Sequence, residues 1–408
     1  MSCIFDMKKN KVKKSNNKST VKGSIILIVL FTLIIIAASF LIANSDFLSA
    51  DSSQSKTSEV NVIENDETDD NLAKQSPVKA KGFPVSFTSN SIKDVQIADS
   101  CIFVLNQDMI SCINNSGSER FSEVVNYVDP VMKTNGQYCL IFDRQGSKYM
   151  ILNKKGIIRN GNSENEALII TGEIAEDGSY IISSGKVGAT SMMTYYSKNG
   201  DMIYQWSCAN EHIISLAISD NKKNLACCAI NSSNGNIYTR IYFFDINSSE
   251  KNKHFTFKTS AALDLFFTSN SSIIAVCNNK RILIDCKSSD LKPVSVEYPS
   301  TILARSNDAN SNTAVISKKI DSFDESELSV YDNKNNLVYS CSVDNGIIDI
   351  ICSRKKVYIL TKSNILVYNS SGKLTRTIEI NSPSIGIAYG YGKLHHFSQG
   401  YLFSAVSL

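Results

Sequence analysis

The chain has 408 residues, of which 43% are hydrophobic and 20% charged, the composition of an ordinary folded protein. Its formal net charge is +3, but the basic residues are concentrated near the N-terminus. Residues 83–408 contain 31 basic and 30 acidic residues, so they lack the positive excess that is typical of nucleic-acid binding. We therefore expect no nucleic-acid partner.

The first predicted element is a transmembrane helix over residues 24–43, which are uncharged and mostly apolar. As a helix, this run would be about 30 Å long, the thickness of the hydrocarbon core of a bilayer. Seven lysines precede it within residues 1–23 and acidic residues follow it, so the positive-inside rule places the N-terminus in the cytoplasm. A cleaved signal peptide ending at Ala43 or Ala50 is the alternative, but the run exceeds the roughly 7–15 apolar residues of such a peptide.

These features predict a single-pass protein of the cell membrane with a lysine-rich cytoplasmic tip at 1–23. Residues 44–82 are rich in Ser, Asn, Asp, Glu and Lys and contain almost no aromatic residues. Such a segment cannot bury enough apolar surface to offset the entropy lost on ordering, so it is predicted to be a flexible tether. A coil of this length spans roughly 35 Å. The predicted folded domain, residues 83–408, would then stand outside the cell, close to the membrane.

One sequence pattern recurs along this domain: an apolar run, a short polar turn and a second alternating run, as in residues 365–378. It predicts a β-hairpin whose turn is formed by Asn369 to Gly372. Six further copies occur at residues 111–117, 150–156, 195–200, 243–249, 283–289 and 330–336. A period of about 40 residues indicates a repeat architecture.

Each repeat also opens with a short apolar strand. These strands begin near Ile92, Val128, Leu168, Ile213, Ala261, Thr301, Ile347 and Ser384. Four-stranded units without helices predict an all-β fold, a β-propeller of eight blades. Seven blades are the alternative, because the units at Val128 and Thr301 are weak. The last unit has room for three strands, around 385–389, 393–398 and 401–406, and we expect Pro84 to Ser89 to supply the fourth and close the ring.

The turn Ser219 to Ala226 resembles the Ser-Pro-Asp-Gly-Lys-x-Leu-Ala turn of WD40-like units, and Ser197 to Trp206 is similar to the Thr-Gly-x-x-x-Trp hairpin of quinoproteins. The chain thus resembles the WD40-like and quinoprotein-like propeller superfamily. The whole arrangement of tip, anchor, tether and propeller also resembles an uncharacterised membrane-anchored propeller family of Firmicutes. The motifs are short, and no functional residues come with the resemblance.

The quinoprotein resemblance implies a dehydrogenase, but those enzymes repeat the Trp in most blades and this chain has Trp206 alone. We expect Trp206 to pack on its sheet. The adjacent Cys227 and Cys228 are predicted to point to opposite faces of a strand and to pack as small apolar residues. None of the histidines, including the adjacent His395 and His396, belongs to a metal-ligand pattern, so no metal or cofactor is predicted.

Ten cysteines fall within the predicted outer domain, mostly in apolar strands and without the Cys-x-x-Cys pairs of zinc sites. Cys101 and Cys112 could face each other across a hairpin, which makes a disulfide conceivable. Buried free thiols are the prediction we favour.

The most regular polar signal lies in the first strands of the repeats. An Asp or Ser precedes an apolar residue at Asp94, Ser215, Asp264 and Asp349. Such positions could line the channel mouth and hold a cation or a ligand amine. Alternatively, each carboxylate bonds backbone N–H groups of the next blade, a structural role that repeat units share. We favour the structural role.

The sequence therefore predicts a protein- or ligand-binding and scaffolding platform at the cell envelope, whose partner is an envelope protein, a peptide or a wall polymer. Loops on the blade faces would supply specificity. The alternative function is an enzyme with a site in the propeller channel, either quinoprotein-like or a hydrolase. A third possibility is a sensor, but the cytoplasmic tip is too short to fold and would need a separate membrane partner.

Overall fold

The computed structural model describes residues 82–87, 91–233, 235–248, 252–258, 260–287, 291–308, 312–319, 324–353 and 355–407. The predicted cytoplasmic tip and transmembrane helix, and the predicted tether apart from Gly82, lie outside these residues. Within the described ranges, no helix is long and apolar enough to cross a membrane.

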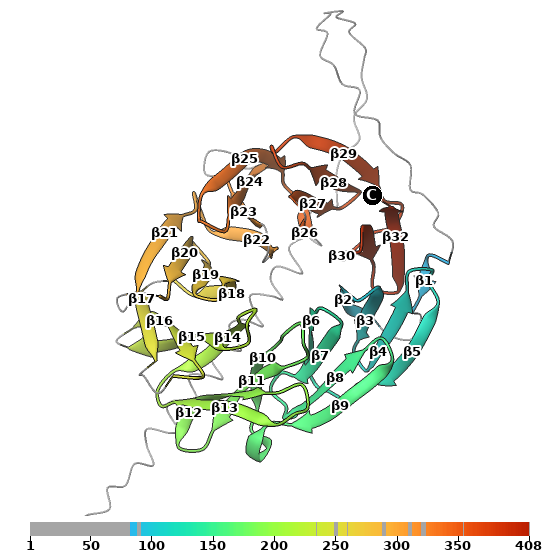
Figure 1. The fold of residues 1–408 in the computed structure, drawn as a ribbon. Helices are drawn as coiled ribbons and strands as arrows, with labels where there is room; N and C mark the ends of the chain where they lie inside the picture. The colour runs from blue at the N-terminus through green and yellow to red at the C-terminus, as the bar shows by residue number, and fades with distance from the viewer. Residues whose placement is uncertain are drawn as a thin grey trace, which may run out of the picture. The chain divides into compact units, whose positions relative to one another are not determined.

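In the described residues the chain forms eight four-stranded antiparallel sheets that surround a central axis, a β-propeller (Figure 1). In blades 1 to 4 the strands are β2 (Ile92–Ala98), β3 (Cys101–Asn106), β4 (Met109–Asn114), β5 (Glu119–Val124); β6 (Pro130–Asn135), β7 (Tyr138–Asp143), β8 (Lys148–Asn153), β9 (Gly156–Asn162); β10 (Ile169–Ile174), β11 (Tyr180–Lys186), β12 (Ala189–Tyr196), β13 (Met202–Cys208); β14 (His212–Ile218), β15 (Asn224–Ser233), β16 (Asn236–Asp245) and β17 (Lys253–Lys258). In blades 5 to 8 they are β18 (Ala262–Ser269), β19 (Ser272–Cys277), β20 (Lys280–Asp285), β21 (Lys292–Glu297); β22 (Ile302–Asn307), β23 (Asn312–Lys318), β24 (Glu325–Asp332), β25 (Leu337–Asp344); β26 (Ile347–Ser353), β27 (Lys356–Thr361), β28 (Asn364–Tyr368), β29 (Leu374–Glu379); β30 (Gly386–Gly390), β31 (Lys393–Phe397), β32 (Tyr401–Ser407) and β1 (Val85–Ser86). A single turn of 3₁₀ helix, Glu164–Glu166, joins β9 to β10.

The all-β fold and the eight blades are confirmed, and the seven-blade alternative is wrong. The first strand of each blade lies innermost (Figure 1), and each begins within two residues of its predicted position. The seven copies of the repeated sequence pattern form the hairpins between the third and fourth strands of blades 1 to 7.

The two ends of the described chain meet in blade 8, as the sequence predicts. β1 is the fourth strand of that sheet and pairs antiparallel with β32, with Val85 opposite Leu402 and Ser86 opposite Tyr401. Side chains of Phe83, Val85 and Phe87 pack against the cluster between blades 8 and 1. The ring is therefore closed by a strand from one end of the domain completing a sheet from the other.

Hydrogen bonding in the turns explains why the same sequence pattern recurs in these hairpins. In the β28–β29 turn, the side chain of Asn369 accepts hydrogen bonds from the backbone N–H groups of Ser371 and Lys373, both at 3.0 Å. Gly372 then adopts a φ of 79°, a left-handed conformation that glycine adopts without strain. In the β24–β25 turn of blade 6, Asn335 occupies the same position with a φ of 70°.

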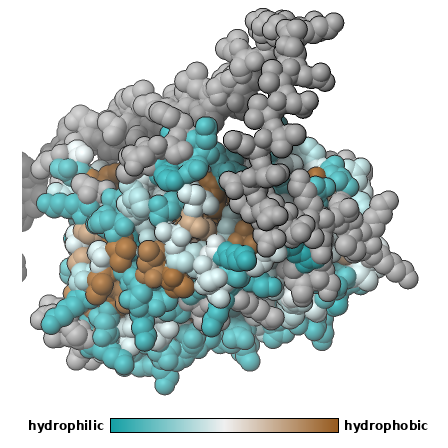
Figure 2. Space-filling model, turned by 90° about the horizontal axis from the view of Figure 1, so that it is seen from above, coloured by the Kyte–Doolittle hydropathy of each residue, from teal (hydrophilic) through white to brown (hydrophobic). Residues whose placement is uncertain are grey.

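Buried hydrophobic side chains fill the spaces between neighbouring blades. Among the described residues, seven of the eight interfaces contain a cluster of at least eight buried hydrophobic residues. Successive residues of a strand face opposite neighbours: Cys227 packs in the cluster between blades 3 and 4, and Cys228 packs in the cluster between blades 4 and 5. The prediction for this cysteine pair is thus confirmed. Hydrophilic side chains predominate on the side of the molecule drawn in Figure 2.

The interface between blades 5 and 6 differs from the other seven. In the described part of the chain its cluster contains three buried hydrophobic residues, Tyr298, Val315 and Tyr331. The space is filled instead by the side chain of Arg281, which is completely buried. A buried guanidinium is costly unless its N–H groups are hydrogen-bonded, so this interface depends on polar contacts where the others depend on apolar packing.

Candidate functional site

The ring of innermost strands holds the four residues predicted from the sequence. Six of these eight strands contain a β-bulge near their start, where the register with the second strand shifts by one residue. The residue that follows each bulge is Asp94, Thr171, Ser215, Asp264, Ala304 or Asp349. The four predicted residues each follow such a bulge, so they occupy equivalent positions in β2, β14, β18 and β26. A bulge also changes the direction of the side chains next to it.

Asp349 joins two blades through its carboxylate. Its Oδ1 accepts a hydrogen bond from the backbone N–H of Ile350 at 2.8 Å, and its Oδ2 accepts one from the backbone N–H of Ile387 in blade 8 at 2.9 Å. Burial raises the pKa of Asp349, and these two hydrogen bonds oppose that rise. In Asp349 the structure therefore shows the structural role, a carboxylate that bonds the backbone of the next blade.

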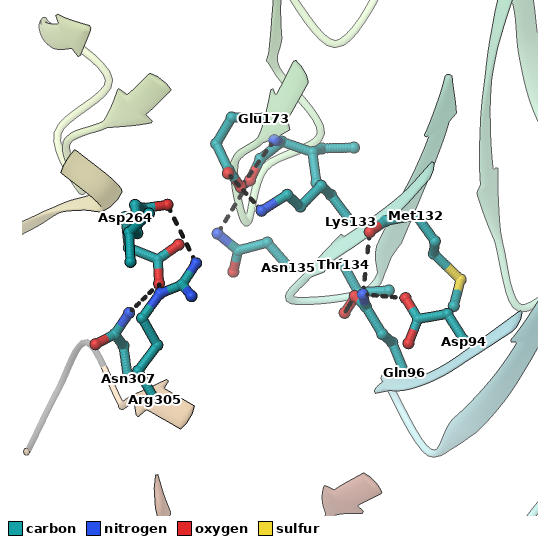
Figure 3. Close-up of polar contacts among 12 residues, drawn as sticks. Asp94, Gln96, Met132, Lys133, Thr134, Asn135, Glu173, Asp264, Arg305 and Asn307 are labelled. Carbon is teal, nitrogen blue, oxygen red and sulfur yellow. Dashed lines mark hydrogen bonds and ion pairs between the residues drawn. The ribbon is translucent and has the colours of Figure 1, made fainter. Parts of the chain in front are cut away.

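Asp264 also reaches the next blade, but through side chains. Nε of Arg305 donates to its Oδ2 at 2.5 Å, and Nδ2 of Asn307 donates to the same oxygen at 3.1 Å (Figure 3). Nη2 of Arg305 also donates to the carbonyl oxygen of Leu263 at 3.2 Å. This group connects β18 to β22 at the interface where apolar packing is least.

Asp94 belongs to a hydrogen-bonded chain between blades 1 and 2. Nε2 of Gln96 donates to Oδ2 of Asp94 at 2.8 Å and to the carbonyl oxygen of Met132 at 3.0 Å. The hydroxyl of Thr134 donates to Oε1 of Gln96 at 3.0 Å (Figure 3). Burial raises the pKa of Asp94, and the charge of Asp349 raises it further.

Glu173 is an acidic residue of the same ring that the sequence analysis did not select. It lies on β10 of blade 3, and its Oε2 is 3.8 Å from Nζ of Lys133 on β6 (Figure 3). Its side chain retains 27% of its accessible surface. Burial raises the pKa of Glu173, the nearby Lys133 lowers it, and the negative charge of Asp264 raises it. Acidic side chains from separate blades therefore influence one another's protonation.

Ser215 has the equivalent position in blade 4 and offers a matched comparison with Asp349. Within the described residues its hydroxyl makes no hydrogen bond. We expect Asp349→Ala to lower the free energy of unfolding by about 1–3 kcal/mol, because two backbone N–H groups lose their acceptor. The same change at Ser215 should cost less than about 0.5 kcal/mol.

Urea unfolding of the two variants, each as the full chain, measures this difference. Equal losses would contradict the structural role of Asp349. A larger loss at Ser215 would mean that the equivalent positions are not used as the hydrogen bonds indicate.

The two adjacent histidines lie in β31, the third strand of the closing blade counted from β1. Both are buried, and burial lowers the pKa of His395 and of His396 to about 4. The hydroxyl of Ser384 is 2.7 Å from Nδ1 of His396, whose ring stacks on Phe403 with the ring centroids 4.7 Å apart. This is a serine–histidine contact, but only 4% of Ser384 is exposed, so a substrate has no access to its hydroxyl.

The remaining sequence candidates are packing residues in the structure. Trp206 is half-buried and contacts the rings of Tyr242 and Phe244, with centroid distances of 4.6 and 5.0 Å. All ten cysteines of the described part are free thiols, including Cys101 and Cys112. The described residues contain no group of three or more His, Cys, Asp or Glu side chains placed to hold a metal ion.

Sequence reasoning missed Glu173, Arg305 and Arg281. For Arg305 a signal was present: the residue that follows the predicted Asp or Ser is apolar in those four units, as at Val95 and Leu265. In the unit that begins near Thr301 the equivalent position is Arg305, after Ala304. For Arg281 no signal was present, because an Arg in an alternating strand is normally exposed.

Comparison with solved structures supports the fold. The chain is similar to BamB from Moraxella catarrhalis, with 11% identity and a TM-score of 0.51, over 79% of this chain and all of that one. It is similar to the C-terminal WD40 domain of Sif2, with 10% identity and a TM-score of 0.58, over 82% of this chain and 99% of that one. Sqt1 from Saccharomyces cerevisiae has 10% identity and a TM-score of 0.52, over 81% of this chain and 98% of that one. At these identities the likeness concerns the fold alone.

Comparison at the level of sequence gives one result. Residues 84–396 match a family of unknown function (DUF5711). No curated protein matches the chain in sequence. The matched range begins at the closing strand and ends within blade 8, so it spans nearly the whole propeller.

Proposed function

Because this chain belongs to the DUF5711 family of unknown function, we propose from its own geometry that it is a binding and scaffolding platform, anchored in the cell membrane with the propeller outside the cell. The observation that carries the proposal is the use of the charged side chains on the innermost strands. Asp94 and Asp264 accept hydrogen bonds through Oδ2 from side chains of the innermost strands, and Asp349 accepts them through both oxygens from backbone N–H groups of these strands. Such bonds stiffen a scaffold and favour recognition by the loops on its two faces.

The anchoring part of the proposal rests on the charge pattern around residues 24–43. The scaffolding part rests on the closed ring, since rigid closed scaffolds with exposed loops are common interaction platforms. The partner classes that suit this location are an envelope protein, a peptide or a wall polymer.

One labelling experiment tests location and binding together. Val187 lies between β11 and β12 and is 97% exposed, while Ser370 is exposed in the turn between β28 and β29. These two connections lie at opposite ends of the strands, so cysteines placed there report on both faces. We expect V187C and S370C to react in intact cells with a membrane-impermeant maleimide that carries a benzophenone. Irradiation should then give a discrete crosslinked product from at least one face.

Native Cys3 in the predicted cytoplasmic tip is the internal control, and it should react only after the cells are permeabilised. The half-buried Cys341 is changed to Ser in all variants to lower the background. Labelling of V187C and S370C only after permeabilisation would contradict the extracytoplasmic location. Labelling without a discrete crosslinked product from either face would contradict the platform.

A further inference from the structure

A surface cavity of about 400 Å³ lies between the outer parts of blades 1 and 2. It is lined by β8, β9, the end of β5 and the connection that leads from β5 to β6. Its volume falls within the range of about 300–1,000 Å³ that is typical of small-molecule sites. It does not overlap the ring of innermost strands described above, so its lining can be considered by itself.

Strand alternation places one set of side chains on the wall formed by blade 2. Lys148 is paired with Asn162, and Met150 is paired with Asn160, across the β8–β9 ladder. Residues two apart on a strand share a face, and Met150 belongs to the buried cluster between blades 1 and 2. The wall therefore presents two carboxamides and one ammonium group above an apolar floor.

Gly161 lies between the two asparagines and shapes the same strand. A Cβ atom at Gly161 would lie 2.3 Å from the ring of Tyr149, closer than atoms can approach. The absence of a side chain lets β9 lie directly on that ring. The position of Asn160 and Asn162 is thus fixed by packing on the opposite face of the strand.

The other wall comes from the connection between β5 and β6. It contributes the side chain of Asn126 and the half-buried ring of Tyr127, which packs against the cluster between blades 1 and 2. Val124, at the end of β5, is 60% exposed beside them. The cavity therefore combines amide groups, a phenol ring and two aliphatic surfaces.

The polar side chains that line this cavity differ from the three aspartates of the innermost strands, which accept hydrogen bonds within the ring. Among the described residues, the side chains of Asn126, Tyr127, Lys148, Asn160 and Asn162 make no hydrogen bond or ion pair. Three asparagines with donors and acceptors available are among the lining residues, and no Asp or Glu is. This lining does not suit a cation, which prefers carboxylate ligands.

We propose that this cavity binds a saccharide. A carboxamide offers a donor and an acceptor side by side, which matches neighbouring hydroxyl groups that both donate and accept. The face of Tyr127 and the aliphatic surfaces of Met150 and Val124 match the C–H groups of a sugar ring, while the phenol keeps a polar end for hydrogen bonding. The inference rests on the proposed platform and names a wall polysaccharide as its ligand class.

Binding is tested on the full chain, held in a detergent without a sugar headgroup, by saturation-transfer NMR with chitotetraose as the probe. Cellotetraose lacks the acetamido groups, so a comparison of the two affinities shows whether these groups contribute to binding. We expect saturable binding of chitotetraose and at least about a tenfold loss of affinity in the double variant N160A/N162A, since two sets of hydrogen bonds are removed. The single variant N126A, on the opposite wall, should weaken binding less.

The control is N247A, which removes an exposed carboxamide after β16 in blade 4, on elements that do not line this cavity, and should leave affinity unchanged. Melting temperatures of all variants check that the fold is intact. Absence of binding by both saccharides would overturn the inference, and so would saturable binding that N160A/N162A and N126A leave unchanged. Because the crosslinking experiment needs no sugar, a failure here with discrete crosslinked products there would remove the saccharide and keep the platform.

Discussion

Replacing Phe83, Val85 and Phe87 together by Ser is expected to lower the free energy of unfolding of the propeller by about 3–5 kcal/mol. These side chains are half-buried in the cluster between blades 8 and 1. Full burial of a Val or Phe side chain stabilises a fold by about 1.5–3 kcal/mol, so three half-buried ones supply most of this loss. The pairing of β1 with β32 would be weakened as well, because these three side chains fix the strand in that cluster.

The measurement is urea unfolding of the full chain followed by circular dichroism. Ser86→Ala is the matched control, because Ser86 lies on the same strand with its side chain exposed and should change stability by less than about 0.5 kcal/mol. A second comparison, of chains that begin at residue 83 and at residue 90, isolates the strand itself. If the triple Ser variant unfolds like the parent chain, β1 does not close the ring in solution.

Arg281→Ala is expected to cost about 3–5 kcal/mol, among the largest effects of any single substitution in this chain. Nη1 of Arg281 donates to the carbonyl oxygen of Asp332 at 2.8 Å and to Oδ1 of Asn335 at 2.7 Å. Nη2 donates to the hydroxyl of Thr313 at 3.2 Å. The alanine variant would remove these donors from the buried side chains of Asn335 and Thr313 and open a cavity between blades 5 and 6.

Burial lowers the pKa of Arg281 to about 10, so the side chain stays charged at neutral pH. Arg281→Met separates packing from hydrogen bonding, because Met fills most of the volume and donates nothing. We expect it to cost roughly half as much as the Ala variant, since an apolar residue of similar size often replaces a buried ion at little cost. Arg120→Ala, at an exposed position of β5, is the control and should be nearly neutral.

Denaturant midpoints of the three variants test this account. A loss below about 1 kcal/mol for Arg281→Ala would show that the polar contacts do not hold blades 5 and 6 together. If Met is as costly as Ala, the hydrogen bonds carry the whole effect and volume carries none.

Blade 6 shows which features could be predicted from the sequence and which could not. Its hairpin at 330–336 is predicted because it repeats the polar turn of the other units. In the structure Asp332 accepts backbone N–H hydrogen bonds in this turn as Asn369 does in blade 7. Asn335 stands where the blade 7 turn has Gly372, and the sequence pattern alone assigns it no partner. In the structure Asn335 is buried and bonds Arg281 of blade 5, and it also donates to the carbonyl oxygen of Val294 at 2.9 Å.

For the four residues predicted on the innermost strands, the positions could likewise be predicted from the sequence and the partners could not. Alternation and turn spacing placed Asp94, Ser215, Asp264 and Asp349 at equivalent points of four strands. Their partners could not be predicted, because Arg305 bonds Asp264 across 41 positions of the chain, and Ile387 bonds Asp349 across 38. The cavity between blades 1 and 2 went unnoticed because asparagines on an outer strand are ordinary surface residues until a second blade faces them.

The sequence by itself determined the repeat, the strand order within each blade and the strand that closes the ring. These follow from short-range physics: side-chain alternation along a strand, turn residues at fixed offsets, and the need of an apolar sheet face for a neighbour. Only the tertiary structure decided which interface is polar, which blade each carboxylate bonds, and where asparagines without hydrogen bonds line a cavity. Such features depend on which side chains face one another between blades, and in this fold each strand has a different neighbour on each side.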